Sequence, residues 1–144
     1  MNNFFSKYFF PRLLILAILV INYAQIFITR TRGNIAFISG GAGEDEANAM
    51  QTMSKNWPLS IEFKRNLTCE EPSVAQVNLR ILGANSKPIF ESIINGPMFL
   101  GRLMPGNYGL SATKGEVTQT RDIQIYEGKS LHIVISWGLS NATV

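Results

Sequence analysis

Apolar and polar residues alternate along most of the chain after Pro72, and this pattern constrains the fold more than any other feature of the sequence. Apolar residues occupy every second position from Val77 to Ile81 and again from Leu131 to Trp137. Because neighbouring side chains of a strand point to opposite faces, this period of two predicts strands with one buried face. Short strands of this kind, separated by turn residues about every eight to twelve positions, are typical of an antiparallel sandwich.

We expect seven strands, each bounded by residues that favour turns. They are Leu59–Phe63, Ala75–Leu82, Ile89–Ile94, Phe99–Leu103, Tyr108–Thr113, Thr118–Ile125 and Leu131–Trp137. Asn95-Gly96 is the strongest short signal for a hairpin, although Pro97 follows it directly. The predicted fold class is therefore all-β, with seven antiparallel strands in a sandwich.

One amphipathic helix is expected before the strands, over residues 45–55 or so. Met50, Met53 and Trp57 follow at helical spacing and would form its apolar face. The acidic residues at 44–46 complement the positive amino end of such a helix. The helix is expected to pack this apolar face on the sandwich.

A glycine-rich segment, Ile35 to Gly43, precedes the helix, and we call it the glycine-rich arm. Its apolar run Ile35–Ile38 is compatible with an edge strand or with an extended arm. Its glycines permit backbone conformations closed to other residues. A phosphate-binding loop would need a following Lys, and the chain supplies acidic residues instead.

The first 24 residues have the pattern of a secretory signal peptide. Lys7 and Arg12 flank the start of an uninterrupted apolar run, Leu13–Ile21, and Ala24 offers a small residue for cleavage. If the leader is not removed, residues 13–29 reach the lower length limit of a membrane-spanning helix and would tether the protein. Both alternatives stay open, and both export the rest of the chain.

Four segments are thus expected along the chain. They are the leader (1–24, or an anchor to about 29), the arm with the helix (25–57), the sandwich (58–138) and a frayed tail (139–144). The net charge of +3 belongs largely to the leader, since from Gly33 onward nine Lys and Arg stand against ten Asp and Glu. Without a basic stripe, nucleic acid is not an expected partner.

The stretch Asn78 to Ile125 resembles a carboxypeptidase regulatory-like domain, a prealbumin-like (transthyretin-like) member of the immunoglobulin-like sandwiches. The resemblance rests on a strand followed by Asn85-Ser86-Lys87-Pro88, and on Leu103-Met104-Pro105-Gly106-Asn107-Tyr108, a turn that delivers an aromatic side chain into the core. The arm and helix also resemble small exported proteins of Gram-negative bacteria that carry this sandwich. The resemblance implies a non-catalytic binding or structural module located in the periplasm, or at the inner membrane facing it.

Little in the sequence indicates catalysis, a cofactor or a metal. His132 is the only histidine and Cys69 the only cysteine, so neither belongs to a ligand cluster that the sequence can define. Cys69 is more simply a semi-buried thiol than a redox group. We therefore expect no enzyme, no catalytic residue and no cofactor. A weak cation site at the acidic residues 44–46 is disfavoured because adjacent carboxylates do not all face one ion.

Two binding functions follow as hypotheses. The first is recognition of an envelope protein, by an edge strand or through the glycine-rich arm and helix start. Its candidate residues are Gly40, Gly41, Gly43, Glu44 and Asp45.

The alternative is a carbohydrate-binding module for cell-wall or exopolysaccharide glycans. Trp57, Tyr108 and Trp137 are in phase with apolar neighbours and are expected in the core. Tyr126 is out of phase with Ile123 and Ile125 and is the expected exposed aromatic residue.

Overall fold

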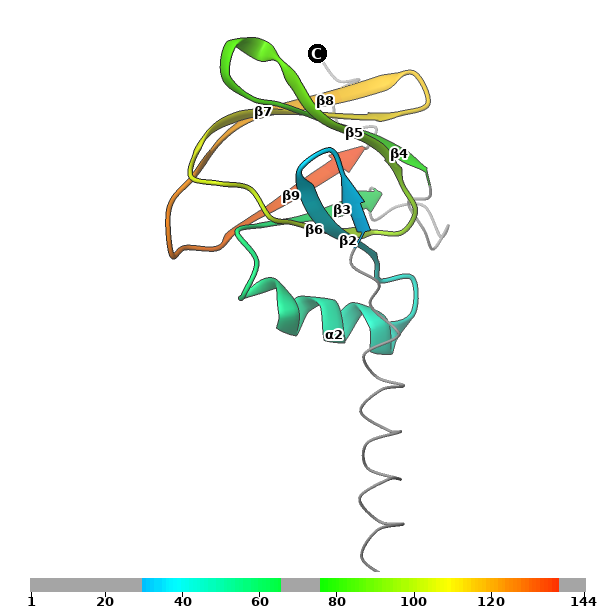
Figure 1. Ribbon diagram of the computed structural model, residues 1–144. Coiled ribbons are helices and arrows are strands. Elements are labelled where there is room, and N and C mark those ends of the chain that lie inside the picture. Colours follow the sequence, from blue (N-terminus) through cyan, green and yellow to red (C-terminus); the bar gives the residue numbers. More distant parts are fainter. Residues whose placement is uncertain (1–29, 66–75, 138–144) are drawn as a thin grey trace, which may run out of the picture.

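The computed structural model of the protein describes residues 30–65 and 76–137 (Figure 1). The leader, Cys69 and the tail lie outside these residues. The elements in chain order are β1 (Arg30–Arg32), β2 (Ile35–Gly40), α2 (Glu44–Ser54), β3 (Leu59–Arg65), β4 (Val77–Leu82), the short 3-10 helix η1 (Ala84–Ser86), β5 (Pro88–Ile94), β6 (Met98–Gly101), β7 (Gly106–Lys114), β8 (Val117–Ile125) and β9 (Leu131–Trp137). No helix in these residues has the length and apolar character needed to cross a membrane.

Two facing sheets form a sandwich, as the alternation predicts. One has the order β1-β2-β6-β3-β9 and the other the order β5-β4-β7-β8. Figure 1 shows α2 outside the sandwich, on the side of the five-stranded sheet. The described part of the molecule therefore has three layers: the four-stranded sheet, the five-stranded sheet and the helix.

All seven predicted strands are present, but the count of seven is too low because β1 and β2 precede them. Strand β2 covers the run Ile35–Ile38 and pairs with β1 on one side and β6 on the other. Of the two alternatives for this run, the strand is confirmed, and it lies inside the sheet rather than at its edge. The sequence of such a short run, followed by glycines, does not indicate which strands it will pair with.

The sheets are not wholly antiparallel, because β3 and β9 run parallel, with Leu59 opposite Leu131 and Arg65 opposite Trp137. The prediction of an antiparallel sandwich is wrong at this pair. A parallel pair requires a long connection, and here the chain builds β4 to β8 before it returns.

The core lies between the two sheets and consists of the inward positions of both. Phe37, Phe90 and Phe99 meet at its centre, with ring centroids 5.1, 5.8 and 5.5 Å apart. Edge-to-face and offset contacts at these separations are the favoured arrangements of aromatic rings. Trp137 joins this core and packs on Phe63.

A second apolar cluster joins α2 to the outer face of the five-stranded sheet. It contains Met50 of α2, Ile38 of β2, Met98 and Leu100 of β6, and Trp57. Trp57 reaches this cluster from the turn after the helix, which ends at Ser54. An isolated helix of this length is marginal in water, so the cluster is what keeps α2 folded.

Asn95-Gly96 does not form the predicted hairpin, since β5 and β6 lie in different sheets. Gly96 has φ +111, and a Cβ atom there would lie 2.7 Å from the Gly40 carbonyl oxygen. The Pro97 carbonyl accepts a hydrogen bond from the Phe63 amide at 2.7 Å. Residues 95–97 therefore form a short connection from one sheet to the other. Gly96 is needed there because a side chain would clash with the Gly40 backbone.

Candidate functional site

Three turns meet at one end of the sandwich and enclose a hollow of about 370 Å³, which we call the end recess. The turns are residues 55–58 after α2, 102–105 after β6, and 126–130 between β8 and β9. Their lining side chains include Lys55, Trp57, Arg102, Tyr126, Glu127, Lys129 and Ser130. This volume is near the lower end of the range of small-ligand sites, about 300–1,000 Å³.

Hydrogen bonds fix the turns that form the end recess. The Ser130 hydroxyl donates to the Lys55 carbonyl at 2.7 Å, and the Leu131 amide donates to the Pro58 carbonyl at 2.9 Å. The Lys129 amide donates to the Tyr126 carbonyl at 3.3 Å and closes the third turn. The hydrogen bonds of Ser130 and Leu131, at the beginning of β9, thus also fix the walls of the recess.

Two cationic side chains lie over the aromatic rings of the recess. The Arg102 guanidinium carbon is 4.5 Å from the ring centroid of Trp57, and the Lys129 ammonium is 5.7 Å from that of Tyr126. Both distances are within the range of cation–π attraction. Trp57 is only 6% exposed, so its ring is a fixed base for the arginine.

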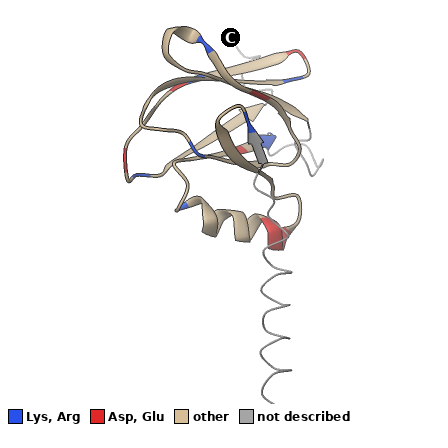
Figure 2. Ribbon diagram, viewed as in Figure 1, with Lys and Arg blue, Asp and Glu red and all other residues tan. Residues whose placement is uncertain are grey.

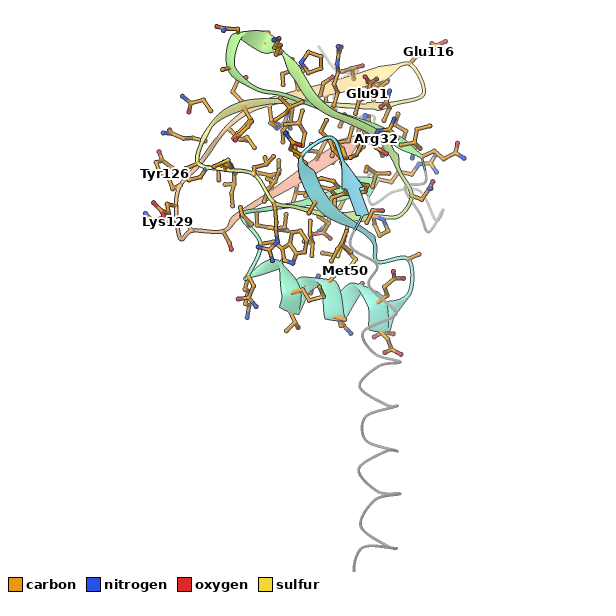
Figure 3. All side chains as sticks on the ribbon, in the orientation of Figure 1. Arg32, Met50, Glu91, Glu116, Tyr126 and Lys129 are labelled. Atoms are coloured by element: carbon orange, nitrogen blue, oxygen red, sulfur yellow. The ribbon has the colours of Figure 1, made fainter. Side chains whose placement is uncertain are left out.

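Tyr126 is the exposed aromatic residue of the recess, as predicted, with 54% of its surface accessible. Its hydroxyl donates to the Gln124 side-chain oxygen at 2.8 Å, which orients the ring. Figure 3 shows Tyr126 and Lys129 together on the loop between β8 and β9. An oriented, exposed ring beside hydrogen-bonding groups can stack on the apolar face of a ligand.

The charge of the end recess is positive. Lys55, Arg102 and Lys129 line it, and Glu127 is the one acidic residue among its described lining side chains. Within residues 30–65 and 76–137, none of the three cations forms an ion pair. Figure 2 shows basic residues just after α2 and on the β8–β9 loop.

The other predicted site residues lie elsewhere. Gly40 ends β2 and is buried, as is Gly41. Gly43, Glu44 and Asp45 are exposed at the amino end of α2. The recess lies beyond the carboxyl end of this helix, whose 11 residues span about 16 Å at 1.5 Å per residue. The structure therefore does not bring Tyr126 together with the residues of the arm.

Gly40 and Gly41 have packing roles that account for the absence of side chains. A Cβ atom on Gly40 would meet the Glu46 side chain, and Gly41 has φ +89 with the Met98 side chain 3.1 Å from its ideal Cβ position. A side chain at Gly40 would displace the Glu46 side chain of α2, and one at Gly41 would crowd Met98 of β6 in a backbone conformation that favours glycine. The first part of the glycine-rich arm is thus an integral part of the sheet and its junction with α2.

A cluster that the sequence analysis missed lies on the outer face of β3 and β9. The Ser60 hydroxyl is 2.7 Å from His132 Nδ1, and His132 Nε2 is 3.7 Å from a Glu62 carboxylate oxygen. Serine, histidine and acid in this order resemble a nucleophilic triad. Only the parallel register, which pairs Ser60 with His132, brings them together, and period-two patterning does not reveal register between distant strands.

The geometry of this cluster is unsuitable for nucleophilic attack. Ser60 is 2% exposed and lies within a regular strand, whereas a nucleophile must reach its substrate. Ser60 and Glu62 also bind opposite ring nitrogens from the same strand, and the Glu62 contact is too long for a good hydrogen bond. The cluster satisfies a buried hydroxyl, and we assign it a structural role.

A larger but more open hollow, of about 500 Å³, lies on the outer face of the four-stranded sheet. Its polar lining includes Asn85 and Ser86 of η1 together with Asn107, Asp122 and Gln124. Within the part of the chain that the structure describes, Asp122 is its one charged lining side chain. Its aromatic lining residue, Tyr108, is half-buried with its hydroxyl bonded to the Met104 carbonyl, and no cation is among its described lining residues, so the end recess is the better candidate site.

No group of three or more His, Cys, Asp and Glu side chains in the described residues could hold a metal ion. Comparison of the chain with protein-family models, with curated proteins and with solved structures finds no match.

Proposed function

We propose that this protein is an exported, non-catalytic binding module of the cell envelope, and that it binds a glycan at the end recess. The observation that carries the proposal is the oriented, exposed Tyr126 ring in a hollow whose other lining groups can donate hydrogen bonds. Sugars present both an apolar ring face and a hydroxyl rim, and a site for them needs both kinds of partner.

The prealbumin-like type of the sandwich remains part of the proposal. Its support is the segment from Leu103 to Tyr108, which leads into β7. The Tyr108 hydroxyl donates to the Met104 carbonyl at 2.6 Å, and its ring packs on the main core. A tyrosine that bonds back to the backbone a few residues upstream is a recurrent device of sandwich corners.

Export, to the periplasm or to the inner membrane facing it, is proposed from the leader sequence. Lys7 and Arg12 with the apolar run Leu13–Ile21 would direct the chain across the membrane, and residues 13–29 would tether it if the leader is retained. Protease added to cells with a permeabilised outer membrane should digest the protein. Protection until the inner membrane is lysed would contradict export.

Recognition of an envelope protein is the second candidate function. Strands β8 and β9 lie at the edges of their sheets, and the side chains of Val117 and Val134 on them are exposed. An edge strand offers unpaired backbone groups to an added strand. Burial of Gly40 and Gly41 leaves the edge strands as the better route for such a partner.

One experiment separates the two candidates. A benzophenone photo-crosslinking residue, which keeps an aromatic ring at the substituted position, is placed at Tyr126 or at Val134 of the full-length protein, and the captured material is identified after irradiation of intact cells. Glycan joined at position 126, with no recurrent protein at 134, supports the proposed function. A recurrent protein at 134 and no glycan at 126 would replace it with the second candidate.

The Tyr126→Ala variant provides a second test. It should reduce retention of the protein on purified cell-wall or exopolysaccharide material without lowering its thermal midpoint. Ile93→Ala is the matched control, since Ile93 is exposed on the four-stranded sheet and does not line the recess. Equal retention of both variants would contradict the proposed site.

A further inference from the structure

We propose that the end recess selects acidic saccharides, in which carboxylates are carried on the sugar rings. The inference rests on the proposed function, because it names the class of glycan that the same site would bind. It is carried by the charge of the recess, by the position of Arg102 and by the pairing of Lys129 with Tyr126.

The ratio of cationic to acidic residues in the recess is higher than in the chain as a whole after the leader. From Gly33 onward the chain has nine Lys and Arg and ten Asp and Glu, yet three of these cations and one acid line the recess. Elsewhere in the described residues, Lys64 and Arg80 lie near the acids Glu62 and Glu91. Among residues 30–65 and 76–137 the three cations of the recess have no such partner, so within this part of the molecule their attraction for an anion is not already satisfied.

Arg102 is positioned to bind a carboxylate. Its guanidinium carbon lies over the Trp57 ring, 4.5 Å from the ring centroid, and Trp57 is fixed in the apolar cluster under α2. Contact through the face of a guanidinium leaves the N–H groups at its edge available, and no ion pair among the described residues uses those of Arg102. That edge matches the two oxygens of a carboxylate, and a restrained arginine loses less entropy on binding.

Lys129 and Tyr126 link the anion to a sugar ring. The Lys129 ammonium lies 5.7 Å from the Tyr126 ring, and both side chains are exposed. An exposed cation–π contact contributes only about 0.5–1 kcal/mol, so a carboxylate can draw the lysine aside at little cost. Its departure frees a ring face on which the sugar carrying that carboxylate can stack.

The test uses the full-length protein in detergent and three probes: a hexasaccharide of galacturonic acid, a neutral hexasaccharide of galactose, and inorganic phosphate. Affinities are measured by calorimetry at an ionic strength of about 0.01 M and again at about 0.1 M, where screening shortens the reach of charges from about 30 to about 10 Å. We expect the acidic probe to bind at least about tenfold more tightly than the neutral one, and less tightly at the higher salt.

Variants identify the groups responsible. Arg102→Gln and Lys129→Gln should each weaken binding of the acidic probe by about tenfold, which corresponds to about 1.4 kcal/mol. Arg102→Lys should recover part of this loss, because it restores the charge without the planar fork. Lys87→Gln is the matched control: Lys87 is exposed, does not line the recess, and its replacement should leave the affinity unchanged.

The outcomes separate this inference from the proposed function. Equal binding of the acidic and neutral probes, with loss of both in Tyr126→Ala, overturns the acidic preference and leaves glycan binding in place. Phosphate that binds as tightly as the acidic probe overturns the saccharide assignment in favour of a general anion site. Failure of both hexasaccharides to bind overturns the inference together with the proposed function.

Discussion

The Ser60 hydroxyl and the Nδ1 atom of His132 lie 2.7 Å apart across the parallel strands β3 and β9. The two side chains differ sharply in environment, since Ser60 is 2% exposed and the His132 side chain 51%. The hydroxyl therefore depends on the imidazole for its partner, whereas the imidazole can turn to water. This asymmetry gives the contact a measurable signature.

His132→Leu should lower the free energy of unfolding by about 1–3 kcal/mol, because it keeps the Ser60 hydroxyl covered but removes its partner. Ser60→Ala should cost no more than about 1 kcal/mol, since water can satisfy His132. In the double variant the two losses should be markedly less than additive. Urea denaturation of all four proteins measures these values. Strict additivity would show that the hydrogen bond does not couple the strands.

Gly96→Ala should destabilise the protein by more than about 2 kcal/mol. The new methyl group would lie 2.7 Å from the Gly40 carbonyl oxygen, and the backbone has φ +111. Gly115→Ala is the control, because Gly115 has φ +61 but open space around its Cβ position, so it reports the backbone strain without the clash. Thermal denaturation should place the Gly96 variant well below the Gly115 variant. Equal midpoints would mean that β2 and the 95–97 segment do not approach so closely.

Met50→Ala should cost about 2–4 kcal/mol, because Met50 is fully buried between α2 and the five-stranded sheet. Amide hydrogen exchange should also become faster throughout α2, since the helix depends on this cluster to stay folded. Gln51→Ala, at the neighbouring exposed position, should change stability by less than about 0.5 kcal/mol. Unchanged exchange rates in the Met50 variant would show that the apolar cluster between α2 and the five-stranded sheet does not keep the helix folded.

Tyr108→Phe should lower stability by about 1 kcal/mol through loss of the hydrogen bond to the Met104 carbonyl. Tyr126→Phe removes a hydroxyl that bonds to Gln124 at the surface, where water can replace it. That variant should be nearly neutral in urea denaturation. If the two substitutions have the same effect, the Tyr108 bond does not fix the turn before β7.

The sequence revealed which residues face inward more reliably than which strands are neighbours. Alternation from Val77 to Ile81 correctly placed these side chains in the core, because a strand's own period fixes its faces. The same period gives no information on which strands pair. It therefore predicts neither the parallel pairing of β3 with β9 nor the pairing of β2 with β6. The hairpin predicted at Asn95-Gly96 is wrong for a related reason. Gly96 does have a positive φ, but it connects β5 to β6, which lie in different sheets.

The candidate site was predicted only through its aromatic residue. Tyr126 stood out because it breaks the phase of β8, and its exposure is confirmed. Lys55, Arg102 and Lys129 gave no signal, since each is a single charge in or beside a turn and resembles any solvated cation. They come from three distant turns, and only the packing of α2 and the return of β9 bring them around one recess.

The parallel pairing of β3 with β9 also sets an order of events in biosynthesis. Strand β3 leaves the ribosome early, but its partner on that side ends at Trp137. Until that residue has been made, one edge of β3 carries unpaired backbone groups, the kind of edge on which strands of other chains can add. Contacts of such long sequence separation also form slowly. A nascent or truncated chain that stops short of β9 should therefore be the form most prone to aggregation and most in need of a chaperone.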